Sequence, residues 1–105
     1  MFVLDYVEND EFIFADSNTR FLQEAEIENM TLQKLKYARN EIYARLGRDF
    51  KSTELKNYFS SKCWYHVIYS PEQFPYESLN QYEKYNVDLL YKREYSLSPD
   101  GYQLK

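Results

Sequence analysis

The stretch "YARNEIYARLGRDF", Tyr37 to Phe50, decides the fold of this chain of 105 residues. Thr31 precedes it and is a suitable N-cap, because a threonine hydroxyl accepts a backbone N–H of the first helical turn. Gly47 follows the last apolar position, and glycine suits the left-handed cap that ends many helices. The pattern predicts one helix between Thr31 and Gly47, with these apolar residues at helical spacing: Leu32, Leu35, Ala38, Ile42 and Leu46.

The same stretch contains the triplet Tyr-Ala-Arg twice, six residues apart. Six helical steps of about 100° turn the second copy about 240° away from the first. Ala38 therefore shares a face with Leu35 and Ile42, whereas Ala44 does not. A surface that stacks nucleic acid would need its aromatic and arginine side chains on one side. We interpret the doubled triplet as a folding signature and expect no nucleic-acid partner.

The segments before and after the signature helix predict shorter elements. Residues 11–14 indicate a short strand or an extended lead-in, and residues 21–30 a short helix. A second helix is expected after a cap at Ser52 or Thr53. The predicted fold is mainly α, a small three- to four-helix domain with a short extended N-terminal segment and an aromatic-rich loop.

The C-terminal half carries that loop and one long helix. The loop spans residues 63–76, and within it residues 70–73 predict a single turn, because they combine a capping-box pattern with proline. The long helix is expected within residues 76–94 and to pack against the signature helix. One of its faces carries Leu79, Tyr82, Asn86, Leu89 and Leu90.

Composition and charge narrow the class of protein. The net charge of −4 is uneven: residues 1–30 hold eight acidic and one basic residue, and residues 31–65 hold eight basic and three acidic residues. The two segments either neutralise each other within the fold or face partners. A single cysteine excludes an internal disulfide and a cysteine-based zinc site. Residues 2–14 have neither a basic n-region nor a long apolar run, so we expect neither a signal peptide nor a membrane helix in this segment, and no direct membrane insertion.

The residues "LKYARNEIYARLGRDFKSTELKNYFSSKCWY" resemble the YARHG domain, a bacterial module named for its own helix motif. The similarity covers residues 12–94, so we divide the chain into a lead-in or linker (1–11), the domain (12–94) and a C-terminal tail (95–105). The resemblance implies an extracellular or cell-envelope location, with the export signal on a longer chain. A cytoplasmic location stays open. Leu46 stands where the family has its histidine, giving "YARLG", so we expect no metal ligand or general base at that position.

The polar side chains of the signature helix admit two interpretations. Arg39, Asn40, Glu41 and Arg45 would form a ligand-binding fork, since arginine binds a carboxylate through two N–H groups. Alternatively they bond to backbone groups of the flanking loops. The motif expected to hold the fold comprises Asn40, Glu41, Tyr43, Ala44, Arg45, Leu46, Gly47 and, on the last helix, Asn86. A buried amide needs a partner, and we expect Asn86 to contact the signature helix or the loop after it.

The aromatic loop is the second candidate site, with Trp64, Tyr65, Tyr69, Phe74 and Tyr76. Exposed rings on a loop can form a platform for sugar or peptide. In the alternative, Trp64 fills the core and the other rings fix the loop to the helices.

The remaining candidate residues give no catalytic or metal signal. His66 has no ligand partner at suitable spacing, and we expect Cys63 to be a small buried residue beside Trp64. The alternating acids Glu24, Glu26 and Glu28 lack the oxygen donors and glycine of a calcium loop, and a solvated edge is the simpler interpretation. We expect no enzyme, no cofactor and no metal.

These observations favour a non-catalytic binding module of a bacterial envelope or extracellular protein that recognises cell-wall glycan or peptide. The alternative is a protein–protein interaction or regulatory module attached to a larger membrane-anchored chain. The partner is then a cell-wall component or another protein, and the sequence leaves the oligomeric state open.

Overall fold

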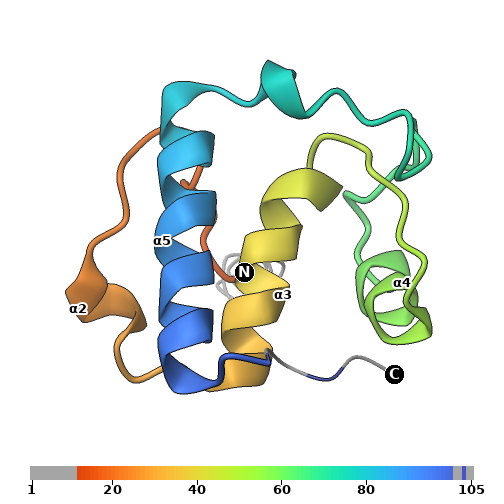
Figure 1. The fold of residues 1–105 in the computed structure, drawn as a ribbon. Coiled ribbons are helices and arrows are strands. Elements are labelled where there is room, and N and C mark those ends of the chain that lie inside the picture. The colour runs from red at the N-terminus through yellow and green to blue at the C-terminus, as the bar shows by residue number, and fades with distance from the viewer. Residues whose placement is uncertain (1–11, 101–102, 104–105) are drawn as a thin grey trace, which may run out of the picture.

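The computed structural model describes residues 12–100 and 103. In this part of the chain the helices are α2 (Glu24–Ile27), α3 (Leu32–Ala44), α4 (Thr53–Ser60) and α5 (Gln81–Leu97), with a 3-10 turn at Tyr76–Ser78 (Figure 1). The described residues contain no strand, which confirms the mainly α fold. Residues 12–14 run irregularly into a turn over residues 15–19, and residue 11 lies outside the described residues.

Helices α3 and α5 lie side by side and form the centre of the molecule (Figure 1). Helix α2 flanks α5, α4 lies on the other side of α3, and the loop between α4 and α5 passes over the top of the view. The predicted packing of the signature helix against the last long helix is therefore confirmed.

Two faces of α3 are buried, and each belongs to a different hydrophobic cluster. Toward α5, Leu35, Ala38 and Ile42 pack in a cluster with Leu90. On another side, Ala44 joins a second cluster with Phe50, Leu55 and Phe59. The two copies of Tyr-Ala-Arg thus place their alanines in separate cores, as the helical geometry predicts.

The ends of α3 follow from its caps. The Thr31 hydroxyl accepts the Lys34 N–H at 3.1 Å, as expected. The helix ends at Ala44, and Gly47 has φ +94°, which side chains with a Cβ rarely adopt. A Cβ at this glycine would lie 2.8 Å from the Ile68 side chain, and the Gly47 carbonyl accepts the N–H of Ile68 and of Tyr69 at 2.8 and 2.9 Å. Gly47 is therefore required where the aromatic loop meets the end of α3.

The other helix starts are also capped locally. The Ser52 hydroxyl accepts the Leu55 N–H at 3.3 Å, so Ser52 is the cap of α4. Asn80 and Glu83 form a reciprocal capping box at the start of α5, at 2.9 and 2.8 Å. The expected single turn is present over residues 71–73, but it is not helical. The helical turn of this loop, a 3-10 turn, lies at Tyr76–Ser78.

Candidate functional site

Glu41 holds the N-terminal segment through two hydrogen bonds. Its carboxylate accepts the N–H of Ile13 at 2.9 Å and the N–H of Phe14 at 3.1 Å. Glu41 is fully buried, and desolvation raises the pKa of its carboxyl group, although the two N–H groups and Arg45 act in the opposite direction. Glu41 therefore serves the fold and is not available to a ligand.

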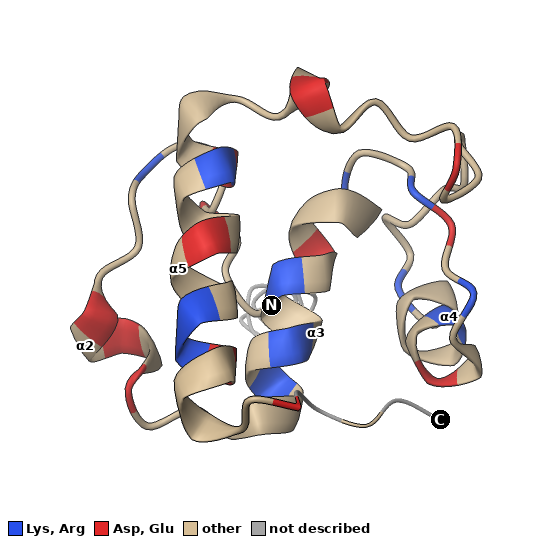
Figure 2. Cartoon of the chain, in the orientation of Figure 1, with Lys and Arg blue, Asp and Glu red and all other residues tan. Residues whose placement is uncertain are grey.

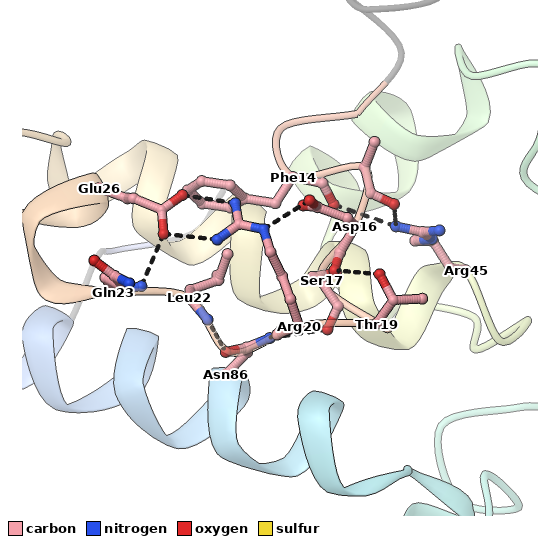
Figure 3. Close-up of polar contacts among 11 residues, drawn as sticks. Phe14, Asp16, Ser17, Thr19, Arg20, Leu22, Gln23, Glu26, Arg45 and Asn86 are labelled. Atoms are coloured by element: carbon pink, nitrogen blue, oxygen red, sulfur yellow. Dashed lines mark hydrogen bonds and ion pairs between the residues drawn. The ribbon is translucent and has the colours of Figure 1, made fainter.

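Arg45, the C-cap of α3, binds the same segment. Its Nη1 donates to the carbonyl oxygens of Phe14 and Ala15 at 3.2 and 2.8 Å (Figure 3), and its guanidinium lies 4.6 Å from the centre of the Phe12 ring. Asn40 donates to the Lys36 carbonyl oxygen within the helix. The structure thus gives Arg45 and Asn40 internal partners.

Asn86 is fully buried and makes three hydrogen bonds to the turn that precedes α2 (Figure 3). It accepts the Leu22 N–H at 2.8 Å and donates to the carbonyl oxygens of Ser17 and Arg20 at 2.8 and 2.9 Å. The expected partner, the signature helix or the loop after it, was wrong. Because Asn86 lies on the side of α5 that faces residues 17–22, the amide completes that turn.

Arg20 closes the same turn with two carboxylates (Figure 3). Its guanidinium binds Asp16 at 2.6 Å and Glu26 at 2.7 Å, and the Gln23 N–H donates to Glu26 at 2.9 Å. The pair with Arg20, together with that N–H, lowers the pKa of Glu26 to about 2. In the described residues no ion pair joins the acidic segment 12–30 to the basic segment 31–65. The acids of α2 lie across α5 from the basic residues of α3 (Figure 2).

The rings of the aromatic loop separate into packed and exposed members. Phe74 is buried, and Trp64 is half-buried between the Phe12 ring at 4.9 Å and the Phe59 ring at 6.2 Å. Tyr65 is half-buried and donates to the Arg48 carbonyl oxygen at 2.7 Å. These three rings fix the loop to the second cluster and to α3, and they do not form a platform.

The two remaining tyrosines of the loop and its cysteine differ in exposure. Tyr69 is half-buried, whereas Tyr76 is 45% exposed and its hydroxyl accepts the Arg48 Nε–H at 2.7 Å. Cys63 is exposed, so the expectation of a buried cysteine is wrong: in the turn after α4, Trp64 and not Cys63 packs onto Phe59. Within the described residues no three His, Cys, Asp or Glu side chains gather as a metal site would require.

A hollow of about 450 Å³ lies between α3, the start of α4 and the aromatic loop. Four cations line it: Lys36 and Arg39 from α3, and Arg48 and Lys51 from the connection to α4. The other lining residues are neutral, and no acidic side chain is among them: Asn40, Tyr43, Phe50, Ser52, Leu55, Pro71 and Tyr76. On a chain with a net charge of −4, this concentration of positive charge marks the hollow as the candidate site.

Two of the four cations are neutralised within the protein. The Arg39 guanidinium binds the Glu94 carboxylate through Nε at 2.5 Å and Nη2 at 3.2 Å, and the Glu94 side chain is almost fully buried. Lys51 pairs with Glu72, but both side chains are exposed, and solvent screens such a pair. Arg39 is thus primarily a structural residue at the edge of the hollow.

The other two cations have no carboxylate partner in the described part of the chain. Arg48 is held by aromatic rings: its guanidinium lies 5.2 to 5.7 Å from the centres of Phe50, Tyr43 and Tyr76. Lys36 is half-buried, and desolvation followed by repulsion from Arg39 lowers the pKa of its ammonium. Lys36 and Arg48 are therefore the two lining cations that make no ion pair in the described residues, although Glu94 attracts Lys36, and Asp49 and Glu72 attract Arg48, from a greater distance.

Sequence reasoning found Arg39 and Tyr76 but missed Lys36, Arg48 and Lys51. The positions 36, 39, 40 and 43 follow the helical spacing of three and four residues, so they share one stripe of α3. That stripe is visible in the sequence. The basic residues after Gly47 reach the same place only because the chain reverses there.

The described residues form a small helical domain with a hollow lined by cations and tyrosines. The family model of the YARHG domain matches residues 10–95, and the chain belongs to this family. YARHG domains generally occur in secreted or envelope proteins. No curated protein and no solved structure matches the chain. None of the helices in residues 12–100 is long and apolar enough to cross a bilayer.

Proposed function

We propose that this domain is a non-catalytic binding module of a bacterial cell-envelope or extracellular protein, and that its hollow recognises cell-wall glycan or peptide. One observation carries the proposal: on an acidic chain the hollow is lined by no acid and by four cations, of which Lys36 and Arg48 make no ion pair in the described residues. Its lining combines positive charge, hydroxyl groups and the rings of Tyr43 and Tyr76, and such convergent polar groups beside aromatic rings are typical of ligand-binding sites.

The aromatic residues give the hollow a surface for a sugar ring or a peptide group. Tyr76 is the exposed ring of the loop, and Tyr43 contacts it edge to face at 5.5 Å between ring centres. Tyr76 also holds Arg48 through its hydroxyl. Replacing Tyr76 should therefore remove a contact surface and release a cation at the same time.

The test is sedimentation of the purified domain with peptidoglycan sacculi. We expect the wild-type protein to be retained, and Tyr76→Ala to lose most of the retention while its circular dichroism stays that of the wild type. Tyr85→Ala is the matched control, because Tyr85 is similarly exposed but lines no hollow described above. Absence of wild-type retention, or equal retention of Tyr76→Ala, contradicts the proposal.

A second candidate function, a protein-interaction module, is favoured by the exposed rings of α5. Tyr85, Tyr91 and Tyr95 are each about half exposed, and Phe21 packs on Tyr85 with 4.9 Å between ring centres. Tyrosine is enriched at protein interfaces because it combines a large contact area with a polar tip. Light scattering at rising concentration distinguishes a self-associating domain, whose mass doubles, from a monomer.

A further inference from the structure

A second, smaller hollow adjoins the first along α3. It has a volume of about 160 Å³, and its lining includes Lys36 and Arg39, which also line the first hollow. Tyr91 and Tyr95 of α5 form its other wall. Because the two hollows share two side chains, they adjoin each other at Lys36 and Arg39, tyrosines line both of them, and we call the pair the trough.

The two ends of this trough differ in charge. The first hollow contains no acid, whereas Glu94 and Asp100 line the second. An anionic group would be attracted more strongly at the first hollow, because in the second Glu94 and Asp100 offset the charges of Lys36 and Arg39. The trough therefore has a polarity, and a ligand with negative charge must place it beside Lys36 and Arg48.

Two different properties make Lys36 and Arg48 suitable for binding an anion: Lys36 makes no ion pair in the described residues, and the Arg48 guanidinium is held in place. Glu94 is the acid that attracts the Lys36 ammonium, but both carboxylate oxygens of Glu94 already accept hydrogen bonds from Arg39. Arg48 is fixed by its bond to the Tyr76 hydroxyl, and its Nη2 makes no hydrogen bond within the described residues. A fixed guanidinium binds a carboxylate or phosphate with little loss of side-chain entropy.

We propose that Lys36 and Arg48 form a subsite for the carboxylate or phosphate of an extended anionic glycan, whose sugar rings continue past Arg39 toward Tyr91 and Tyr95. This inference rests on the proposed function and names the ligand chemistry at the same hollow. A glycan is favoured over a peptide because exposed tyrosine rings flank the charged centre at both ends: Tyr76 at one end, and Tyr91 and Tyr95 at the other, 52% and 57% exposed. Flat aromatic faces stack on sugar rings.

The ¹⁵N-labelled domain is titrated with four soluble probes. Isothermal titration calorimetry measures the affinity of each probe, and NMR chemical shifts locate its binding site. Tetragalacturonate carries carboxylates, its methyl ester is neutral, an oligomer of glycerol phosphate carries phosphates, and tetraglutamate is an acidic peptide. We expect tetragalacturonate or the glycerol phosphate oligomer to bind at least about tenfold more tightly than the methyl ester and tetraglutamate. Whichever of the two anionic probes binds better identifies the source of the anion.

The variants locate the anion. Lys36→Gln should weaken binding of the preferred probe about tenfold, and Arg48→Lys should weaken it less, because the charge remains while the fork is lost. Lys34→Gln is the matched control, since Lys34 is exposed on the same helix and lines neither hollow. In the wild type, raising the salt from about 50 to 300 mM should weaken binding of the anionic probe and leave the methyl ester unaffected.

The inference is overturned if the methyl ester or tetraglutamate binds as well as the anionic glycans, if salt has no effect, or if Lys34→Gln and Lys36→Gln behave alike. Its failure is separable from failure of the proposed function. If sacculi are retained but retention is indifferent to salt and to Lys36→Gln, the domain binds cell wall without this anion subsite. If sacculi are not retained but the anionic probe binds at Lys36, the anion subsite is real and its cell-wall source is wrong.

Discussion

Asn86→Ala tests the central claim about the fold, that one buried amide ties the N-terminal turn to α5. The amide makes three hydrogen bonds, of 2.8, 2.8 and 2.9 Å, and its residue is 0% exposed. Alanine would leave one N–H and two carbonyl groups without partners. A buried unsatisfied group costs about 1–3 kcal/mol, and partial access of water to the turn lowers the total, so we expect a loss of about 3–5 kcal/mol. For a domain of typical stability this is a large fraction of the free energy of unfolding.

The assay is urea unfolding followed by circular dichroism, with the free energy extrapolated to water. Asn57→Ala is the control, because Asn57 is exposed on α4, and its cost should stay below about 0.5 kcal/mol. Asn86→Asp should also destabilise, since one carboxylate oxygen would face the carbonyl groups of Ser17 and Arg20. A loss below about 1 kcal/mol for Asn86→Ala would refute the claim that these three bonds hold the turn.

Further predictions concern single side chains. Gly47→Ala should lower the free energy of unfolding by about 1–3 kcal/mol, measured by urea unfolding, because of the positive φ and the close side chain beside it. Glu41→Gln should lose one of two N–H acceptors and release the N-terminal segment, which would red-shift the emission of the single tryptophan, as the ring that stacks on it comes from that segment. The pKa of Glu26, lowered by Arg20, should be about 2 by ¹³C NMR, so its contribution to stability is present above about pH 4.5 and is lost as the pH falls toward 2. Lys36→Gln should leave stability unchanged or raise it by up to about 1 kcal/mol in thermal unfolding.

The helices and caps could be predicted because their signals are local. Thr31 and Ser52 act on groups within a few residues, Gly47 ends α3 through its N–H to Ala44, and the apolar spacing of α3 fixes the face that meets α5. The same locality explains why the two alanines of the doubled triplet were assigned correctly to different faces. Capping and periodicity depend on chain geometry alone, and no tertiary information is needed.

The turn at Asp16–Arg20 is indicated by its own residue types, but the groups that hold it could not be predicted because they are distant in sequence. Glu41 is 28 residues from Ile13, and Asn86 is 64 residues from Leu22. The sequence showed that Asn86 lies on an inward face but not which backbone groups face it. Residues 11–14 likewise looked like a short strand or an extended lead-in, and in the described residues 12–14 the Glu41 carboxylate takes the N–H groups that a strand partner would have used.

Only the α3 part of the hollow could be predicted, because the rest of its lining comes from residues distant in sequence. Within α3, some polar side chains serve the fold and others line the hollow. Arg39, Glu41 and Arg45 looked like a ligand fork, yet each is satisfied inside the protein, so replacing any of them should cost stability. Lys36 is the opposite case: it is partly desolvated, has no carboxylate partner in the described residues, and its pKa is lowered by burial. A charge kept in that state lowers the stability of the fold, and because shifted pKa values cluster at functional sites, it agrees with the proposed anion subsite. The signature triplets thus build the domain, whereas Lys36, which lies between the helix start and the first triplet, makes no ion pair in the described residues.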